Sequence, residues 1–166
     1  MSGYFVIIRG PLGVGKTTVA LRLAKELGAE YISIDQILDD EGLWDEGKLS
    51  EFLNANRFAA GRAANHLANG TPVIFDGNFY WREQIDDLIG RLPYRNYVFT
   101  LDAPLSVCVE RDAGRSAPHG SEAARQVYEK TNRFAHGIGL DATRSVERMV
   151  GEIASNIAAK SNKARG

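Results

Sequence analysis

Short apolar runs alternate with amphipathic stretches along the whole chain. Each apolar run predicts a β-strand, and the runs are YFVII (4–8), AEYISID (29–35), TPVIFDGN (71–78), YRNYVFTLDA (94–103) and HGIGLDAT (136–143). The third run is nearly continuous, as in a strand that is covered on both faces of a sheet. We expect the second strand to end at Asp35, the third at Asp76 and the fourth near Asp102.

Helical periodicity fills the intervals between these runs. The first helix has one apolar face and a stop at Gly28, and the face consists of Val19, Ala20, Leu23, Ala24 and Leu27. A long helix over 48–70 shows an apolar stripe made of Leu49, Leu53, Ala60, Ala63, Ala64 and Leu67. Further helices are predicted at 82–92, 105–112, 120–134 and 145–160. This alternation predicts an α/β domain with a parallel sheet and helices on both faces. Ligands then bind beyond the carboxyl ends of the strands.

The segment GPLGVGKT, at 10–17, stands between the first strand and the first helix. Its spacing is G-x-x-x-x-G-K-[ST], the phosphate-binding loop. Glycines let backbone N–H groups turn inward, and the helix N-terminus adds its dipole. Lys16 is expected to reach the β- and γ-phosphates of ATP, and Thr17 to offer its hydroxyl to Mg²⁺. The expected nucleotide-binding residues are Gly10, Pro11, Leu12, Gly13, Val14, Gly15, Lys16, Thr17 and Thr18.

Two carboxylates are expected at the same edge of the sheet. Asp76 follows an apolar strand and is the expected partner of Mg²⁺, although the DGN sequence is also typical of a turn or a helix cap. Asp35 would activate an acceptor hydroxyl and take its proton. The alternative for Asp35 is a structural role as the cap of the helix that starts at QILDD.

Arginines and aromatic residues supply further candidates. Arg111 and Arg115 are four positions apart beside a segment rich in Gly, Pro and Ser, and we expect a lid at about 111–125 that stabilises transferred charge. A solvated loop is the alternative. Asn78 and Arg82 are the expected acceptor-binding residues, in the run NFYWR. The aromatic residues at 79–81 either line the acceptor pocket or pack against the helix that follows.

Composition narrows the class of partner. Lys and Arg total 20 against 21 Asp and Glu, and this net charge of −1 disfavours nucleic acid as a partner, although a local basic groove stays open. The only cysteine, Cys108, can form no intrachain disulfide and is expected to be buried, in a cytoplasmic protein. No apolar stretch has membrane-spanning length, and the N-terminus lacks the pattern of a signal peptide. The three histidines lack metal-ligand spacing.

With these motifs assembled, the sequence resembles small P-loop kinases of the polynucleotide-kinase-like and zeta-toxin-like ATP-binding group. Shikimate kinases, gluconate kinases and antibiotic phosphotransferases are near relatives. The matching segments are GPLGVGKT, ISIDQI, VIFDGNFYWR, CVERDAGR and GLDATRSVERMV. The resemblance implies a three-layer P-loop fold with five parallel strands in the order 2-3-1-4-5. It also implies that Asp35 activates the acceptor and that Arg111 and Arg115 bind phosphate. Arg82 lies near the position at which the family has an acceptor-binding arginine.

The sequence therefore predicts a single kinase domain over 1–166, a monomer or homodimer, that uses ATP and Mg²⁺ to phosphorylate a hydroxyl of a small molecule. DGNFYWR departs from the D-G-[FY]-P-R of nucleotide monophosphate kinases, which argues against a nucleotide acceptor. Two other functions stay open. One is a kinase of polynucleotide 5′-hydroxyls, and the other is a non-catalytic ATP-binding regulatory module.

Overall fold

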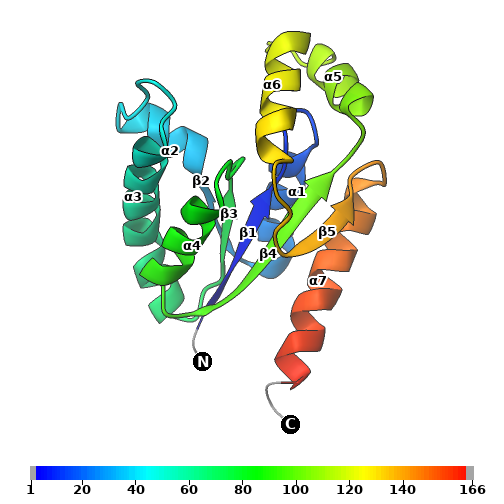
Figure 1. Ribbon diagram of the computed structural model, residues 1–166. Helices are drawn as coiled ribbons and strands as arrows, with labels where there is room; N and C mark the ends of the chain where they lie inside the picture. The colour runs from blue at the N-terminus through cyan, green and yellow to red at the C-terminus, as the bar shows by residue number, and fades with distance from the viewer. Residues whose placement is uncertain (1–2, 164–166) are drawn as a thin grey trace.

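The computed structural model describes residues 3–163, in which strands and helices alternate (Figure 1). The strands are β1 (Tyr4–Arg9), β2 (Glu30–Ser33), β3 (Val73–Asp76), β4 (Arg95–Asp102) and β5 (Ile138–Asp141). The helices are α1 (Lys16–Leu27), α2 (Ile34–Asp40), α3 (Leu49–Ala68), α4 (Arg82–Arg91), α5 (Leu105–Ala113), α6 (Ser121–Thr131) and α7 (Val146–Lys163).

The strands form one parallel sheet in the order β2-β3-β1-β4-β5, as the sequence predicted. Ser33 of β2 pairs with Asp76 of β3, and Ile8 of β1 pairs with Asp76 from the other side. The carboxyl ends of these three strands are therefore level with one another. In Figure 1 they point upward, towards the end of the molecule where α5 and α6 lie.

Each face of the sheet carries its own hydrophobic core, which gives three layers. Successive side chains of a strand point to opposite faces. Phe5 and Ile7 of β1 accordingly pack with residues of α2, α3 and α4, whereas Val6 and Ile8 pack with residues of α1 and α7. Figure 1 shows α3 and α4 beside one half of the sheet and α7 beside the other. The predicted three-layer P-loop fold is confirmed.

The start of α2 differs from the sequence-based prediction. Strand β2 ends at Ser33, and Asp35 lies in the first turn of α2 instead of at the end of the strand. The Ser33 hydroxyl accepts a hydrogen bond from the Gln36 backbone N–H at 3.2 Å, so Ser33 is the cap of this helix. The Asp35 carboxylate is thereby left free for other contacts.

Two further features bear on the sequence-based predictions. Cys108 is buried and carries a free thiol, as expected. Among the described residues, no helix combines the length and the apolar character needed to cross a membrane.

Candidate active site

The phosphate loop connects β1 to α1, and glycine is required there for two separate reasons. Gly13 and Gly15 have positive φ angles of 78° and 94°, a region that costs other residues free energy. In addition, a Cβ atom on Gly13 would overlap the backbone carbonyl of Cys108 in α5. The loop therefore packs directly against the backbone of α5. Within the described chain, the amides of Gly13, Gly15 and Lys16 donate to no backbone carbonyl and stay free for a ligand.

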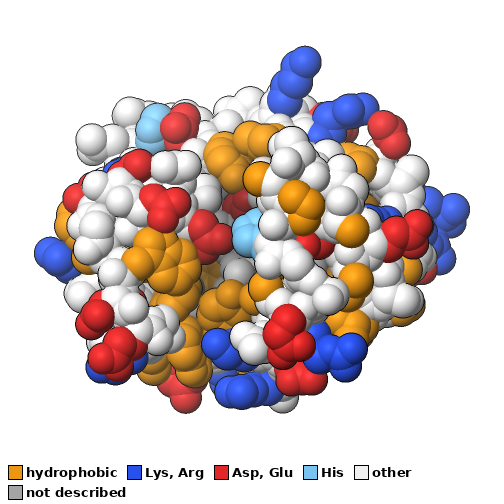
Figure 2. Space-filling model, turned by 90° about the horizontal axis from the view of Figure 1, so that it is seen from above, with side chains coloured by type: hydrophobic (Ala, Val, Ile, Leu, Met, Phe, Trp, Pro, Cys, Tyr) orange, Lys and Arg blue, Asp and Glu red, His pale blue; other side chains and the backbone are white. Residues whose placement is uncertain are grey.

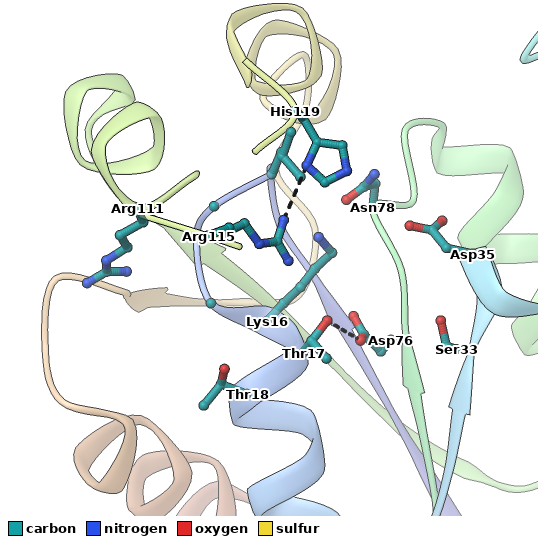
Figure 3. A pocket seen from close by; sticks show the side chains of 13 residues that line it. Lys16, Thr17, Thr18, Ser33, Asp35, Asp76, Asn78, Arg111, Arg115 and His119 are labelled. Carbon is teal, nitrogen blue, oxygen red and sulfur yellow. Dashed lines mark hydrogen bonds between the residues drawn. The ribbon is translucent and has the colours of Figure 1, made fainter. Parts of the chain in front are cut away.

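A cavity of about 430 Å³ opens above this loop. Figure 2 shows the molecule from that side, hollowed near its centre, with acidic side chains and a histidine at the rim. Figure 3 shows the lining residues, which come from the phosphate loop and the start of α1, from β2, β3 and the residues that follow these strands, and from α5 and the segment between α5 and α6. They are Leu12, Gly13, Gly15, Lys16, Thr17, Thr18, Ser33, Asp35, Asp76, Asn78, Arg111, Arg115 and His119.

Lys16 and Asp35 face each other across this cavity, and burial opposes the charge of both. Burial lowers the pKa of the Lys16 ammonium, while Asp76 and then Asp35 act in the opposite direction. Burial likewise raises the pKa of the Asp35 carboxyl, and the attraction of Lys16 partly offsets this rise. Each group thus makes the charge of the other less costly to hold in the cavity.

Asp76 has the environment expected of a carboxylate near a metal ion. Its Oδ2 atom accepts hydrogen bonds from the Thr17 hydroxyl at 2.8 Å and from the Tyr31 hydroxyl at 2.6 Å. Its Oδ1 atom is buried and has no hydrogen-bond partner, so a lone pair is available to Mg²⁺ or to a water bound to it. Between residues 3 and 163, no group of three or more His, Cys, Asp or Glu side chains is placed so that it could hold a metal ion by itself.

The segment between α5 and α6 is held together at Asp112. This buried carboxylate accepts hydrogen bonds from the backbone amides of His119 and Gly120, at 3.0 Å for each to Oδ2. Burial opposes the ionisation of Asp112, but these bonds outweigh it and lower its pKa. The His119 ring contacts both Asp112 and Arg115, at 3.1 and 3.4 Å. Arg115 and His119 therefore project into the cavity above Lys16 (Figure 3).

The two predicted lid arginines occupy different sides of the phosphate loop. Arg115 lies within the cavity, over Lys16, whereas Arg111 lies apart from both (Figure 3). The Arg111 guanidinium donates to the Val14 carbonyl at 3.1 Å, so it braces the loop from its outer side. Both side chains are among the lining residues of the cavity, and their role in stabilising transferred charge stays a prediction.

The segment after β3 divides its residues between the cavity and the core. Asn78 lines the cavity and donates to the Tyr80 hydroxyl at 2.7 Å. Burial raises the pKa of Tyr80 to about 12. Phe79 is fully buried, and Tyr80 and Trp81 pack around Phe52 of α3 at ring-centroid distances of 5.6 and 5.2 Å. None of these three aromatic residues lines the cavity, which favours the packing alternative.

The structure does not bring Arg82 into the cavity. Its guanidinium points towards the segment between α6 and β5, where it contacts the Ala135 carbonyl at 3.4 Å and the ring of Phe134 at 5.3 Å. Within the phosphate loop, Gly10, Pro11 and Val14 also lie outside the lining, and the Val14 amide donates to the Pro11 carbonyl at 3.3 Å. The other predicted site residues all line the cavity.

Sequence reasoning missed three residues of the site, Ser33, Tyr31 and His119. Ser33 was identifiable, because it stands two positions before Asp35 in the same S-x-D segment. Tyr31 looked like one more apolar strand residue, and nothing in its spacing indicates that its hydroxyl reaches Asp76. His119 lies in the predicted lid segment, four positions after Arg115, but nothing in the sequence indicates that its ring reaches the cavity.

A phosphate loop on a parallel sheet of this strand order, with carboxylates facing the loop lysine, defines the fold as that of a small P-loop protein whose nearest fold class is the kinase-like one. Residues 5–136 match the family described as AAA domain, and the chain belongs to that family.

Individual relatives agree with this class. The chain is 26% identical over 129 residues to a shikimate kinase of Actinobacillus succinogenes, covering 75% of this chain and 73% of that protein. Its fold is similar to that of a gluconokinase from Sinorhizobium meliloti, with a TM-score of 0.77, 18% identity and coverage of 99% and 96%. It is also similar to the APS kinase CysC of Mycobacterium tuberculosis in complex with AMPPNP and APS, with a TM-score of 0.78, 18% identity and coverage of 95% and 98%. At such identities the structures establish a kinase-like P-loop fold.

Proposed function

We propose that the protein is a kinase that uses ATP and Mg²⁺ to phosphorylate a hydroxyl group of a small molecule. One observation carries the proposal. A single cavity holds the lysine of the phosphate loop, a hydroxyl–carboxylate pair suited to Mg²⁺, and a second carboxylate, Asp35, that has no hydrogen-bonding duty in capping its helix. A protein that only binds nucleotide needs the first two features but not the third.

The phosphate-binding half consists of the loop amides, Lys16, Thr17 and Asp76. The free amides and the Lys16 ammonium would hold the phosphate chain of ATP, which supplies the γ-phosphoryl group when bound. Thr17 and the unpartnered Oδ1 atom of Asp76 would hold Mg²⁺, directly or through water. On the lid, Arg115 would neutralise charge on the phosphoryl group, and Arg111 would fix the loop through Val14.

The acceptor-binding half consists of Asp35 and Asn78, which lie on the side of the cavity away from Arg111 (Figure 3). Asp35 would orient the acceptor hydroxyl and take its proton. Its raised pKa makes it a stronger base than an ordinary aspartate. The names of the similar proteins, shikimate kinase and gluconokinase, are consistent with a small hydroxyl-bearing acceptor. Arg82 stays a proposed acceptor residue that would act after a rearrangement of the segment around Phe134.

A screen of acceptors tests the function. ATP consumption with Mg²⁺ would be measured against panels of sugars, sugar acids, alcohols, nucleosides, antibiotics and a 5′-hydroxyl oligonucleotide. We expect one small-molecule class to stimulate turnover. The Asp35→Asn variant should then bind ATP with unchanged affinity but turn over about a hundredfold or more slowly, the scale of a general base.

Asp40→Asn is the matched control, because Asp40 is an exposed carboxylate on the same helix whose side chain contacts Gln36. This control should keep wild-type turnover. Stimulation by the oligonucleotide alone would replace the proposal with a polynucleotide kinase. ATP binding without turnover on any acceptor, or normal turnover in Asp35→Asn, would contradict the proposal.

A further inference from the structure

A buried arginine stands immediately before the phosphate loop. Arg9 is the last residue of β1, and its side chain is fully buried. Burial, together with the nearby Arg82, lowers its pKa to about 10, which leaves it charged at neutral pH. Among the described residues, no carboxylate pairs with it. A buried charge without hydrogen-bond partners costs folding free energy. The neutral acceptors around the Arg9 guanidinium must therefore offset the cost of burying its charge.

One set of partners lies at the C-terminal end of α6. The Arg9 guanidinium donates to the carbonyls of Thr131 at 2.7 Å and Phe134 at 3.5 Å, and it lies 4.4 Å from the centre of the Phe134 ring. Thr131 is the last residue of α6, where helix carbonyls are unsatisfied and the dipole is negative. Arg9, from the interior of the protein, therefore holds the C-terminal end of α6. The N-terminal end of the same helix directly follows His119 and Gly120.

Arg9 also has a partner within the sheet, because its guanidinium donates to the Thr100 hydroxyl of β4 at 3.2 Å. The remaining partner lies on the acceptor side of the cavity. The same guanidinium donates to the Phe79 carbonyl at 3.1 Å. Phe79 has a φ angle of 49°, and it is the only non-glycine residue with positive φ among those described. Such a conformation costs free energy and persists only where surrounding contacts hold it. Its neighbours Asn78 and Tyr80 are joined by a hydrogen bond, and Asn78 lines the cavity.

We infer that Arg9 is a positioning residue that ties the C-terminal end of α6 to the acceptor-side segment 77–81. One planar guanidinium holds the Thr131, Phe134 and Phe79 carbonyls at the same time, so neither segment moves without disturbing the other. When phosphate groups order Arg115 and His119, which precede the N-terminal end of α6, the ordering reaches Asn78 through α6 and Arg9. Only this last step rests on the proposed nucleotide-binding function.

Hydrogen–deuterium exchange measured by mass spectrometry tests the inference in two arms. The first arm uses ligand-free protein and compares Arg9→Met with wild type. Exchange should rise about tenfold or more in both 77–81 and 131–137, because each segment loses a hydrogen bond to a charged group. Replacing a buried ion by an apolar side chain of similar length is often tolerated by the fold. Arg9→Lys keeps the charge without the planar fork and should show a smaller rise in both segments.

Arg95→Met is the control, because Arg95 is an exposed strand arginine whose guanidinium donates to the Ser161 hydroxyl at 3.1 Å, away from both segments. It should leave both segments unchanged. A general loss of stability would instead raise exchange throughout, including the centre of β4 and α7. A rise in only one of the two segments, in neither, or equally everywhere would overturn the inference. If Arg9→Met does not fold, Arg9→Lys decides the question by the same criterion.

The second arm adds Mg²⁺ and AMPPNP. Wild type should gain protection in 111–125 and in 77–81, whereas Arg9→Met should bind AMPPNP with similar affinity and gain protection only in 111–125. Protection of 77–81 that persists in Arg9→Met would overturn the coupling. If AMPPNP fails to bind wild type by calorimetry, the proposed function falls, and the ligand-free arm still decides whether Arg9 joins the two segments.

Discussion

Replacing Gly13 by alanine should destabilise the fold by two separable effects. The first is backbone strain, because φ at Gly13 is 78° and alanine in the left-handed region costs about 1–2 kcal/mol. The second is overlap of the new methyl group with the Cys108 carbonyl, which forces α5 and the phosphate loop apart. Overpacking of this kind costs about 1–3 kcal/mol, so the sum is roughly 2–5 kcal/mol. That is a large part of the roughly 5–15 kcal/mol that stabilises a typical domain.

Gly42→Ala separates the two effects. Gly42 also has a positive φ, of 60°, but nothing lies within 4 Å of a Cβ atom placed there. It should therefore lose only the strain, about 1 kcal/mol after allowance for the more restricted unfolded chain.

Urea denaturation of both variants and of wild type gives the free energies of unfolding, and calorimetry with AMPPNP gives the affinities. Gly13→Ala should lose more stability than Gly42→Ala and should also lose nucleotide affinity. If the two variants lose the same stability, the loop is not packed against α5 as described, and the reasoning fails.

Three further predictions concern Asp35, Tyr31 and Arg82. Because burial raises the pKa of Asp35, turnover should fall on acidification at a higher pH than for an ordinary aspartate. The native state then holds the Asp35 proton more tightly than the unfolded state, so wild type loses free energy of unfolding as pH rises from acidic to neutral. Asparagine does not titrate, so the advantage in free energy of unfolding of Asp35→Asn over wild type should grow over this range. A difference that stays constant in urea denaturation at several pH values would contradict this. Tyr31→Phe removes a hydrogen bond to the Asp76 carboxylate and should cost about 1.5 kcal/mol in urea unfolding, with weaker Mg²⁺-AMPPNP binding by calorimetry; unchanged values would assign Tyr31 no role. Arg82→Ala should leave the ATP Kd unchanged while kcat/KM for the acceptor falls about tenfold or more. Normal kinetics with a lowered Tm would make Arg82 structural.

Much of the fold could be predicted because local and long-range signals agree. The apolar runs, the helical periodicity and the phosphate loop all indicate the same parallel sheet, and the stop at Gly28 is confirmed by its left-handed conformation. The buried stripe of α3 was only partly predicted. Ala64 is exposed, whereas Phe52, Ala55 and Ala59 are buried. This helix has alanines on more than one face, so periodicity alone does not fix which face turns inward.

The site residues that could be predicted are those that stand at the carboxyl ends of the strands. Asp76 comes directly after an apolar strand, and the sheet register then sets it level with Ser33. Arg9 could not be predicted as buried, because arginine is mostly exposed and its partners, carbonyls and one hydroxyl, lie about 70 to 125 positions away in the chain. The sequence also did not indicate that Arg111 and Arg115 lie on different sides of the phosphate loop, because this depends on how the end of α5 packs against that loop.

The charges of the cavity explain why the same site can serve both halves of the proposed reaction. Burial acts against the charge of Lys16 and of Asp35, so the ligand-free cavity holds both charges at a cost. A bound phosphate chain would compensate Lys16, because opposite charges nearby favour the charged form. The same phosphates bring negative charge towards Asp35 and would raise its pKa further, which strengthens it as a base. A general base works best when its pKa approaches the working pH. Binding of the nucleotide would thus prepare Asp35 to accept the proton of the acceptor hydroxyl, and this order of events follows from the placement of one lysine between two carboxylates.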